Sequence, residues 1–268
     1  PGGVTAFGES PFSGCTALED VVLQEGLASI GDSLFAGCIG LRRVSIPGSV
    51  TRIANYAFSG CRELSGVEIP STIVSIGDYA FKGCTRLGSI VIPGGVSSIG
   101  RGVFNDCTSL SSATLGDGLG LVSDYLFAGC ISLRNVSLPA GVAKIGSHAF
   151  SGCRGLAGIS LPASVSSIEE CAFKDCLGLK GFTIPGGVIS IGASPFSGCT
   201  ALESVVIQEG VTAIGDTLFT GCTGLKSVTI PGSVRTIGKS AFKGCTSLRG
   251  VLIQDGVTAI RDSLFDGC

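Results

Sequence analysis

The chain repeats one pattern of hydrophobic and polar positions with a fixed 23-residue period and no insertion along its length. Each repeat contains a cysteine, and position n denotes the nth residue after that cysteine. Position 3 is leucine in all eleven complete repeats, position 6 is mostly valine or isoleucine, and position 8 is isoleucine or leucine. Since positions 6 and 8 point the same way from an extended backbone, they predict a short strand with one buried face.

The second half of each repeat predicts a bend, a further apolar pair and a tight turn. Position 9 is usually proline, as at Pro47, which ends the strand because proline lacks a ladder donor. Positions 12 and 15 are apolar, as in Val50 and Ile53, and glycine usually follows at position 16, where a tight turn would need it. An Asp or Asn at position 17 then predicts a capped helical or 3₁₀ turn that brings a phenylalanine inward.

Twelve cysteines keep this period without a slip from Cys15 to Cys268, and a phenylalanine stands at the third position before each of them. A fixed period of this length predicts a solenoid in which each turn packs only on its neighbours. Equivalent side chains should then form columns inside the structure. The predicted core includes Phe35, Phe58, Phe81, Cys38, Cys61, Cys84, Leu41, Leu64 and Leu87.

The segment from Ile46 to Leu64 reads IPGSVTRIANYAFSGCREL, and its spacing of phenylalanine, glycine and cysteine recurs along all 268 residues. Together with the leucine–valine–isoleucine strand pattern, it resembles the BspA-like (Treponema pallidum-type) leucine-rich repeat family. The resemblance implies a leucine-rich repeat solenoid. This is a right-handed curved rod with a parallel β-sheet on one face and short β or 3₁₀ turns on the other. With turns about 4.8 Å apart, the rod should be roughly 55 Å long. The resemblance also implies a secreted or cell-surface protein, and an intracellular location stays open.

We expect residues 1–268 to form a single array of eleven complete repeats and a partial one. Both ends fall within a repeat, so we expect a piece of a longer chain, or ends that dock on other chains. Residues 9–38 and 193–222 match at 22 of 30 positions, which indicates block duplication. Four repeats lack the proline at position 9 and carry leucine at position 19. Block duplication explains this longer period, and the alternative explanation is a periodic surface for lateral packing. The four replacing residues are Gln24, Gly116, Gln208 and Gln254.

The composition narrows the possible partners. Proteins that bind nucleic acid usually carry an excess of basic residues. The formal net charge here is -2, so nucleic acid is not expected as a partner. Only 14% of the residues are charged, which favours association with a protein partner or with copies of the same chain. No apolar run approaches the roughly 20 residues that span a bilayer, so no membrane insertion is expected.

Thirteen cysteines raise the question of disulfides and metals. Twelve occupy equivalent sites, so their side chains should run parallel in one column, which suits the disulfide dihedral poorly. We predict a column of buried free thiols that act as small hydrophobic residues. No C-x-x-C spacing is present, so neither a zinc site nor another cofactor is expected.

Position 18 holds every tyrosine, the only histidine and the only cysteine outside the column. His148 and Cys171 should therefore lie one turn apart. A nucleophilic dyad or a metal site needs a sheltered pocket and further groups, which the edge of a rod does not supply. Ordinary surface variation and a partner-contact stripe are the remaining interpretations. The residues of that stripe are Tyr56, Tyr79, Tyr125, His148 and Cys171.

The outward strand positions 5 and 7 are mostly small and include no aromatic residue. Such a face suits either an unspecialised surface or packing against another sheet or chain. The chain has no recognisable catalytic motif, and we expect no enzyme activity. The favoured hypothesis is a non-enzymatic scaffold that binds protein partners or self-assembles through its solenoid surfaces. The alternative, which comes from the resemblance, is an adhesin that binds host or matrix proteins.

Overall fold

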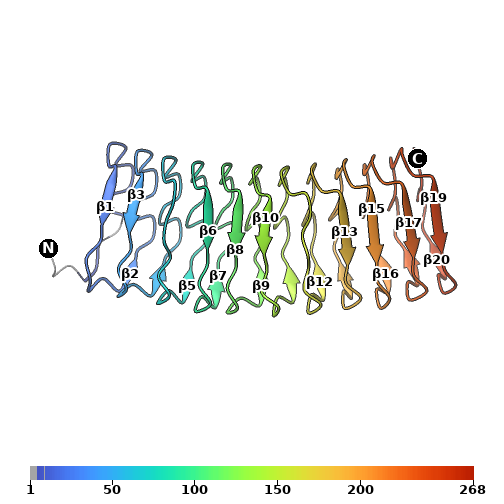
Figure 1. Ribbon diagram of the computed structural model, residues 1–268, viewed down its shortest axis with the longest axis horizontal. Coiled ribbons are helices and arrows are strands. Elements are labelled where there is room, and N and C mark those ends of the chain that lie inside the picture. The colour runs from blue at the N-terminus through green and yellow to red at the C-terminus, as the bar shows by residue number, and fades with distance from the viewer. Residues whose placement is uncertain (1–4, 9) are drawn as a thin grey trace.

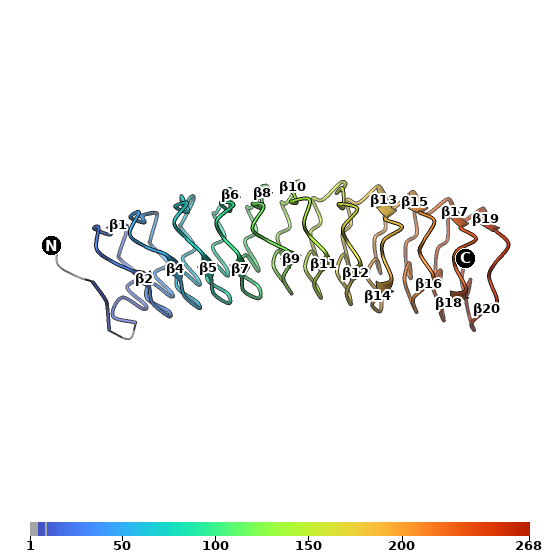
Figure 2. The same ribbon diagram turned by 90° about the horizontal axis from the view of Figure 1, so that it is seen from below.

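A computed structural model describes residues 5–8 and 10–268 and shows a parallel β-solenoid with one 23-residue repeat in each turn (Figure 1). Strands line two opposite sides of the rod, termed the front sheet and the back sheet (Figure 2). Each side is divided into three sections, and within a section each strand pairs in parallel with the strand one turn away. The period of the sequence sets the register. Val21 pairs with Val44 in one sheet, and Ile30 pairs with Ile53 in the other, so the partners in each pair are separated by one full repeat.

The front sheet contains the longer strands, which the leucine–valine–isoleucine pattern predicts. Its strands are β1 (Asp20–Val22), β3 (Arg43–Ser45), β6 (Ser89–Val91), β8 (Ser112–Thr114), β10 (Asn135–Ser137), β13 (Gly181–Ile184), β15 (Ser204–Ile207), β17 (Ser227–Ile230) and β19 (Gly250–Ile253). They form three sections, in the orders β1-β3, β6-β8-β10 and β13-β15-β17-β19. Between the sections, residues 66–68 and 158–160 follow the same path without strand pairing.

The back sheet consists of two-residue strands at positions 14 and 15. These are β2 (Ser29–Ile30), β4 (Arg52–Ile53), β5 (Ser75–Ile76), β7 (Ser98–Ile99), β9 (Leu121–Val122), β11 (Lys144–Ile145), β12 (Ser167–Ile168), β14 (Ser190–Ile191), β16 (Ala213–Ile214), β18 (Thr236–Ile237) and β20 (Ala259–Ile260). The back sections are β2-β4-β5-β7, β9-β11-β12-β14 and β16-β18-β20. The second residue of most of these strands is buried, because it is the apolar residue of position 15. The back of the rod is therefore short β-structure joined by hydrogen-bonded turns, and no 3₁₀ helix occurs in the described residues.

The core consists of columns of equivalent side chains. The phenylalanine rings stack from Phe12 to Phe265, with centroids 5.1–5.8 Å apart between neighbouring turns. Nine representative core residues are at most 1% exposed: Phe35, Phe58, Phe81, Cys38, Cys61, Cys84, Leu41, Leu64 and Leu87. Each ring is covered on both faces by the next turns, which explains why a single repeat has no stable core of its own.

All thirteen cysteines are free thiols, and the column cysteines do more than fill space. From Cys38 to Cys268, each thiol donates a hydrogen bond of 2.9–3.2 Å to the carbonyl oxygen of the phenylalanine in the preceding turn. Burial raises the pKa of the Cys61 and Cys107 thiols to about 12. The prediction of small hydrophobic residues is therefore incomplete, because each thiol is also a donor between turns.

The turn after the back strand differs from the expected capped helical turn. The residue with positive φ is not the glycine of position 16 but the residue of position 18, as in Tyr56 with φ of 55°. Most repeats have glycine at position 16, where successive turns approach closely: a Cβ on Gly77 would lie 2.6 Å from the backbone nitrogen of Asn55. The polar residue at position 17 links turns: Asn55 Oδ1 accepts the backbone N–H of Asp78 at 2.8 Å.

Candidate interaction surfaces

His148 and Cys171 lie in adjacent turns, as the period predicts, but their surroundings do not form a catalytic pair. The His148 ring stacks on the Tyr125 ring, with centroids 4.7 Å apart. Cys171 is 8% exposed, and burial raises the pKa of its thiol. A nucleophilic cysteine needs the opposite shift, towards the thiolate. No hydrogen bond joins the two side chains in the part of the chain that the structure describes.

The aromatic residues of position 18 form two separate stacks. Tyr56 and Tyr79 stack with centroids 5.4 Å apart, and the Tyr79 ring leans over Gly102, which interrupts the column. Tyr125 stacks on His148 in the second group, and the Arg101 guanidinium lies 4.5 Å from the Tyr125 centroid. Each of these rings has one face stacked on its neighbour, and Tyr56 remains 44% exposed. Its role as a partner-contact stripe stays a prediction.

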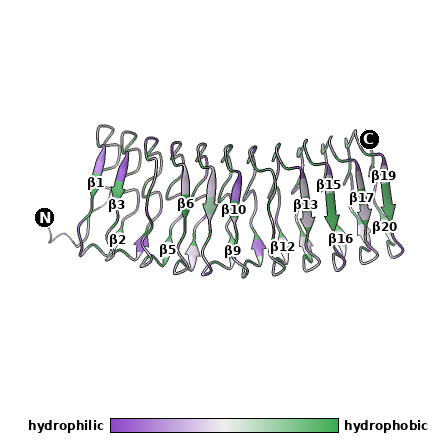
Figure 3. Cartoon of the chain, viewed as in Figure 1, coloured by the Kyte–Doolittle hydropathy of each residue, from purple (hydrophilic) through white to green (hydrophobic). Residues whose placement is uncertain are grey.

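The outward side of the front sheet, termed the strand face, is formed by positions 5 and 7. It is uneven in hydropathy, with β3 and β10 more polar and β15 and β19 more apolar (Figure 3). Exposed apolar side chains occur at position 7 of four turns: Val22 at 69%, Val91 at 62%, Val206 at 55% and Leu252 at 59% exposure. Scattered exposed apolar residues are common on protein surfaces, so this row alone does not define a site.

Two hollows in the strand face coincide with the two breaks in the front sheet. The first has a volume of about 750 Å³ and extends across residues 66–68; Asp20, Arg43 and Glu68 contribute charge to its lining. The second, of about 580 Å³, extends across residues 158–160 and is lined by Ser112, Ala113, Thr114, Arg134, Asn135, Val136, Ser137, Gly158, Ile159, Ser160, Gly181, Phe182 and Thr183. A Cβ on Gly66 or Gly158 would meet nothing within 4 Å, so glycine at position 5 leaves these places open.

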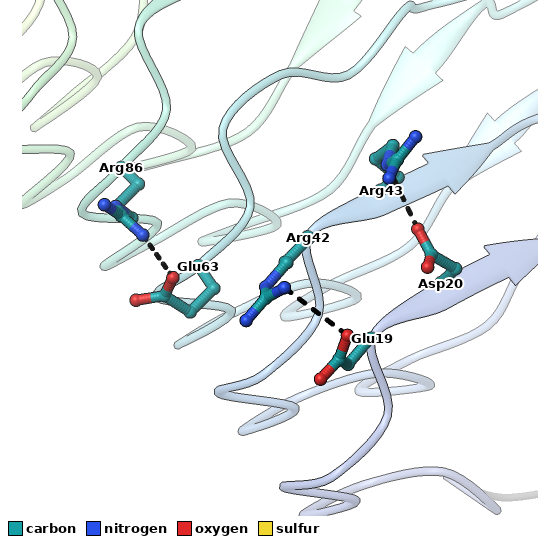
Figure 4. Close-up of polar contacts among 6 residues, drawn as sticks. All are labelled: Glu19, Asp20, Arg42, Arg43, Glu63 and Arg86. Carbon is teal, nitrogen blue, oxygen red and sulfur yellow. Dashed lines mark hydrogen bonds and ion pairs between the residues drawn. The ribbon is translucent and has the colours of Figure 1, made fainter.

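Ion pairs link successive turns along the edge where the front strands begin. Glu19 pairs with Arg42 at 3.4 Å and Asp20 pairs with Arg43 at 3.2 Å, while Arg86 pairs with Glu63 (Figure 4). All six side chains are at least 37% exposed. Exposed pairs of this kind contribute about 0–1 kcal/mol each, so their main effect is on the charge of the surface.

The sequence-based reasoning did not identify the two hollows. The available signal was glycine at position 5 together with arginine at position 1, which occurs at Arg62 with Gly66 and again at Arg154 with Gly158. No cluster of three metal-ligating side chains occurs in residues 5–8 and 10–268. Across the same described residues, no helix has the length and apolar character to cross a membrane.

Comparison with known proteins identifies the repeat. The sequence matches the family described as "BspA type Leucine rich repeat region (6 copies)" over residues 1–111, 52–180 and 144–268. The chain belongs to the BspA-type leucine-rich repeat family. Among proteins of curated function, none matches the sequence. Solenoid proteins of this family are typically interaction scaffolds, which agrees with the coarse function expected from the repeats.

Three solved structures are similar to this leucine-rich repeat chain. A leucine-rich repeat protein from Bacteroides ovatus is 30% identical, with a TM-score of 0.69, over 99% of this chain and 80% of its own. The T. pallidum leucine-rich repeat protein is 31% identical, with a TM-score of 0.57, over 60% of this chain and 78% of its own. A leucine-rich cell surface protein from Faecalibacterium prausnitzii is 25% identical, with a TM-score of 0.50, over 88% of each chain.

Proposed function

We propose that this leucine-rich repeat protein is a non-enzymatic scaffold that holds a protein partner on its strand face. The observation that carries the proposal is the hollow of about 580 Å³ between β8 and β13, which has an open glycine floor and a polar rim. Ser112, Asn135 and Thr183 present side chains there from three different turns. A rigid backbone that holds such groups in fixed register can bind with little ordering cost.

Catalysis is not part of the proposal. The pair that offered the best nucleophile, His148 and Cys171, consists of a stacked imidazole and a buried thiol whose pKa is raised. The strand face itself carries hydroxyl, amide and guanidinium groups, which suit recognition. We place the binding surface on the strand face and treat the position-18 column as a secondary contact.

A cell-surface role as an adhesin is the more specific form of this function. It is supported by the similarity to a leucine-rich cell surface protein from F. prausnitzii. The partner would then be a host or matrix protein, whereas a purely structural role would use a second copy of the chain. The adhesin role and the structural role would both use the strand face, so one pair of variants tests both roles together.

Gly158→Leu places a side chain in the hollow, and Gly141→Leu is the matched control. Neither glycine has positive φ, and a Cβ at either would meet nothing within 4 Å. Binding of single purified matrix proteins is measured by biolayer interferometry, and self-association by sedimentation velocity. We expect the wild type and the control to bind alike and Gly158→Leu to bind at least tenfold more weakly. Binding that Gly158→Leu leaves unchanged, or no interaction in either assay, would refute the proposal.

A further inference from the structure

Half of the basic residues of the chain lie on one long edge of the rod. The strand-start edge comprises positions 1 to 5 of every turn, where the chain enters the front sheet (upper edge in Figure 1). It carries nine basic residues, which are Arg42, Arg43, Arg62, Arg86, Arg134, Arg154, Lys180, Lys226 and Arg249. It carries only four acids, Glu19, Asp20, Glu63 and Glu203. Its formal charge is therefore +5, whereas the rest of the chain carries nine basic and sixteen acidic residues and a charge of -7.

The four acids of the strand-start edge are already paired with basic residues of the next turn. Besides the pairs with Arg42, Arg43 and Arg86, Glu203 accepts from Lys226 at 2.5 Å. The remaining five basic residues make no ion pair within the described part of the chain, and all are exposed: Arg62, Arg134, Arg154, Lys180 and Arg249. The excess positive charge of this edge is therefore not neutralised by the protein.

Three of these unpaired residues belong to the turns at the second break in the front sheet. Arg134 lines the hollow of about 580 Å³, Arg154 begins the turn that contains Gly158, and Lys180 directly precedes β13. Arg134 and Lys180 are two turns apart, which is about 10 Å along the axis at the usual spacing of paired strands. A ligand in the hollow would thus meet positive charge on one side and neutral polar groups beneath it.

The basic residues also recur along the axis. Position 4 holds five of them: Arg42, Arg134, Lys180, Lys226 and Arg249. Arg42 and Lys226 are paired with Glu19 and Glu203. The unpaired Arg134, Lys180 and Arg249 follow one another at two and three turns, which is about 10 Å and about 14 Å at the usual strand spacing. Such a row fits a long, linear, repeating anion better than a compact one.

We propose that the strand-start edge and the adjoining hollow bind a linear polysaccharide that carries sulfate or carboxylate groups. The cations would hold its anionic groups, and the hydroxyl and amide groups of Ser112, Asn135, Ser137, Ser160 and Thr183 would bind its hydroxyl groups. In the described residues the strand face has no exposed aromatic side chain, so it offers no platform on which nucleic-acid bases could stack. This inference goes beyond the proposed protein contact and does not depend on it.

The test compares two double variants with the same loss of charge. Arg134→Ser with Lys180→Ser removes unpaired cations beside the hollow, and Arg52→Ser with Lys239→Ser removes exposed cations elsewhere on the rod. Binding of heparin, hyaluronate, polyglutamate and an oligodeoxythymidylate is measured by isothermal titration calorimetry at several salt concentrations. Circular dichroism and thermal unfolding verify that each variant is folded.

We expect salt-dependent binding of a polysaccharide that weakens roughly 5- to 30-fold in the variant at the hollow, as two contacts of about 0.5–1 kcal/mol would give. The control should change by less than about twofold. Binding of heparin alone assigns the site to sulfate, and binding of hyaluronate as well assigns it to carboxylate. Absence of polysaccharide binding at low salt, equal loss in both variants, or tighter binding of polyglutamate or the oligonucleotide would overturn the proposal.

Discussion

Substitution of Cys107 by serine and by alanine separates the two roles that the structure gives to the cysteine column. Cys107 is fully buried, and its thiol donates to the carbonyl oxygen of Phe81 at 3.2 Å. The same oxygen also accepts the backbone N–H of Cys84 at 3.2 Å. Alanine at this site therefore removes a donor and some buried volume without leaving the carbonyl unsatisfied.

The magnitudes follow from these contacts. The alanine variant loses the burial of one methylene-sized atom, about 0.8 kcal/mol. The void left in a packed column adds about 0.5 kcal/mol, and the weak thiol hydrogen bond about 0.5 kcal/mol. We expect Cys107→Ala to lower the free energy of unfolding by about 2 kcal/mol. Serine keeps a donor on the same Cβ, and a hydrogen bond from its hydroxyl to the Phe81 carbonyl would offset the cost of burying the hydroxyl. Cys107→Ser should cost no more than the alanine variant.

The order of the two variants is the test. Urea unfolding followed by circular dichroism gives the midpoint of each protein, and comparison of midpoints is appropriate because solenoids do not always unfold in one step. If the thiol were only a small hydrophobic residue, the buried hydroxyl of serine would be the worse substitution. A serine variant less stable than the alanine variant by more than about 1 kcal/mol would refute the donor role.

Three further predictions rest on the same geometry. With iodoacetamide at pH 8, the exposed Cys268 should be alkylated quickly, whereas the fully buried thiols, whose pKa is raised by burial, should react only after unfolding. Mass spectrometry identifies the alkylated sites, and rapid labelling of buried thiols would contradict the raised pKa. Gly77→Ala should lower stability by about 1–3 kcal/mol, because its Cβ would lie 2.6 Å from the preceding turn, while Gly141→Ala, which meets nothing within 4 Å, should change it by less than about 1 kcal/mol in thermal unfolding. The hydrogen bond from Lys226 lowers the pKa of Glu203 from its usual 4.5. The stabilisation of the fold by this Lys226–Glu203 pair is therefore present above pH 4.5 and is lost as the pH falls through the lowered pKa. NMR titration should show a higher Glu203 pKa in Lys226→Gln, and an unchanged pKa would exclude the Lys226–Glu203 pair in solution.

The repeat unit was predictable in detail because its causes are local and identical in every turn. The register of one full repeat between paired strands follows from the spacing of the cysteines, and the inward positions 6 and 8 follow from strand alternation. The turn after Ile53 was predicted less well. Gly77 is needed because the backbone of Asn55 lies against it, and a contact between turns cannot be seen within one repeat. For the same reason, the polar cap expected within a turn proved to link one turn to the next.

The candidate surfaces depended on tertiary structure to a greater extent. The sequence predicted that His148 and Cys171 would be neighbours, but only the structure showed a stacked ring and a buried thiol. It also showed that Gly66 and Gly158 coincide with breaks in the front sheet and with hollows. The charge of the strand-start edge was present in the sequence, but it became visible only when residues were grouped by their place on the rod.

By itself, the sequence determined the solenoid, its period, its core columns and the family to which the chain belongs, because a strict repeat leaves only one way to bury its apolar positions. Only the tertiary structure decided which turns leave the strand face open, which cations remain unpaired and what each thiol contacts. These properties arise from side chains and backbone atoms that lie a full repeat or more apart in the chain and are brought together by the stacking of turns.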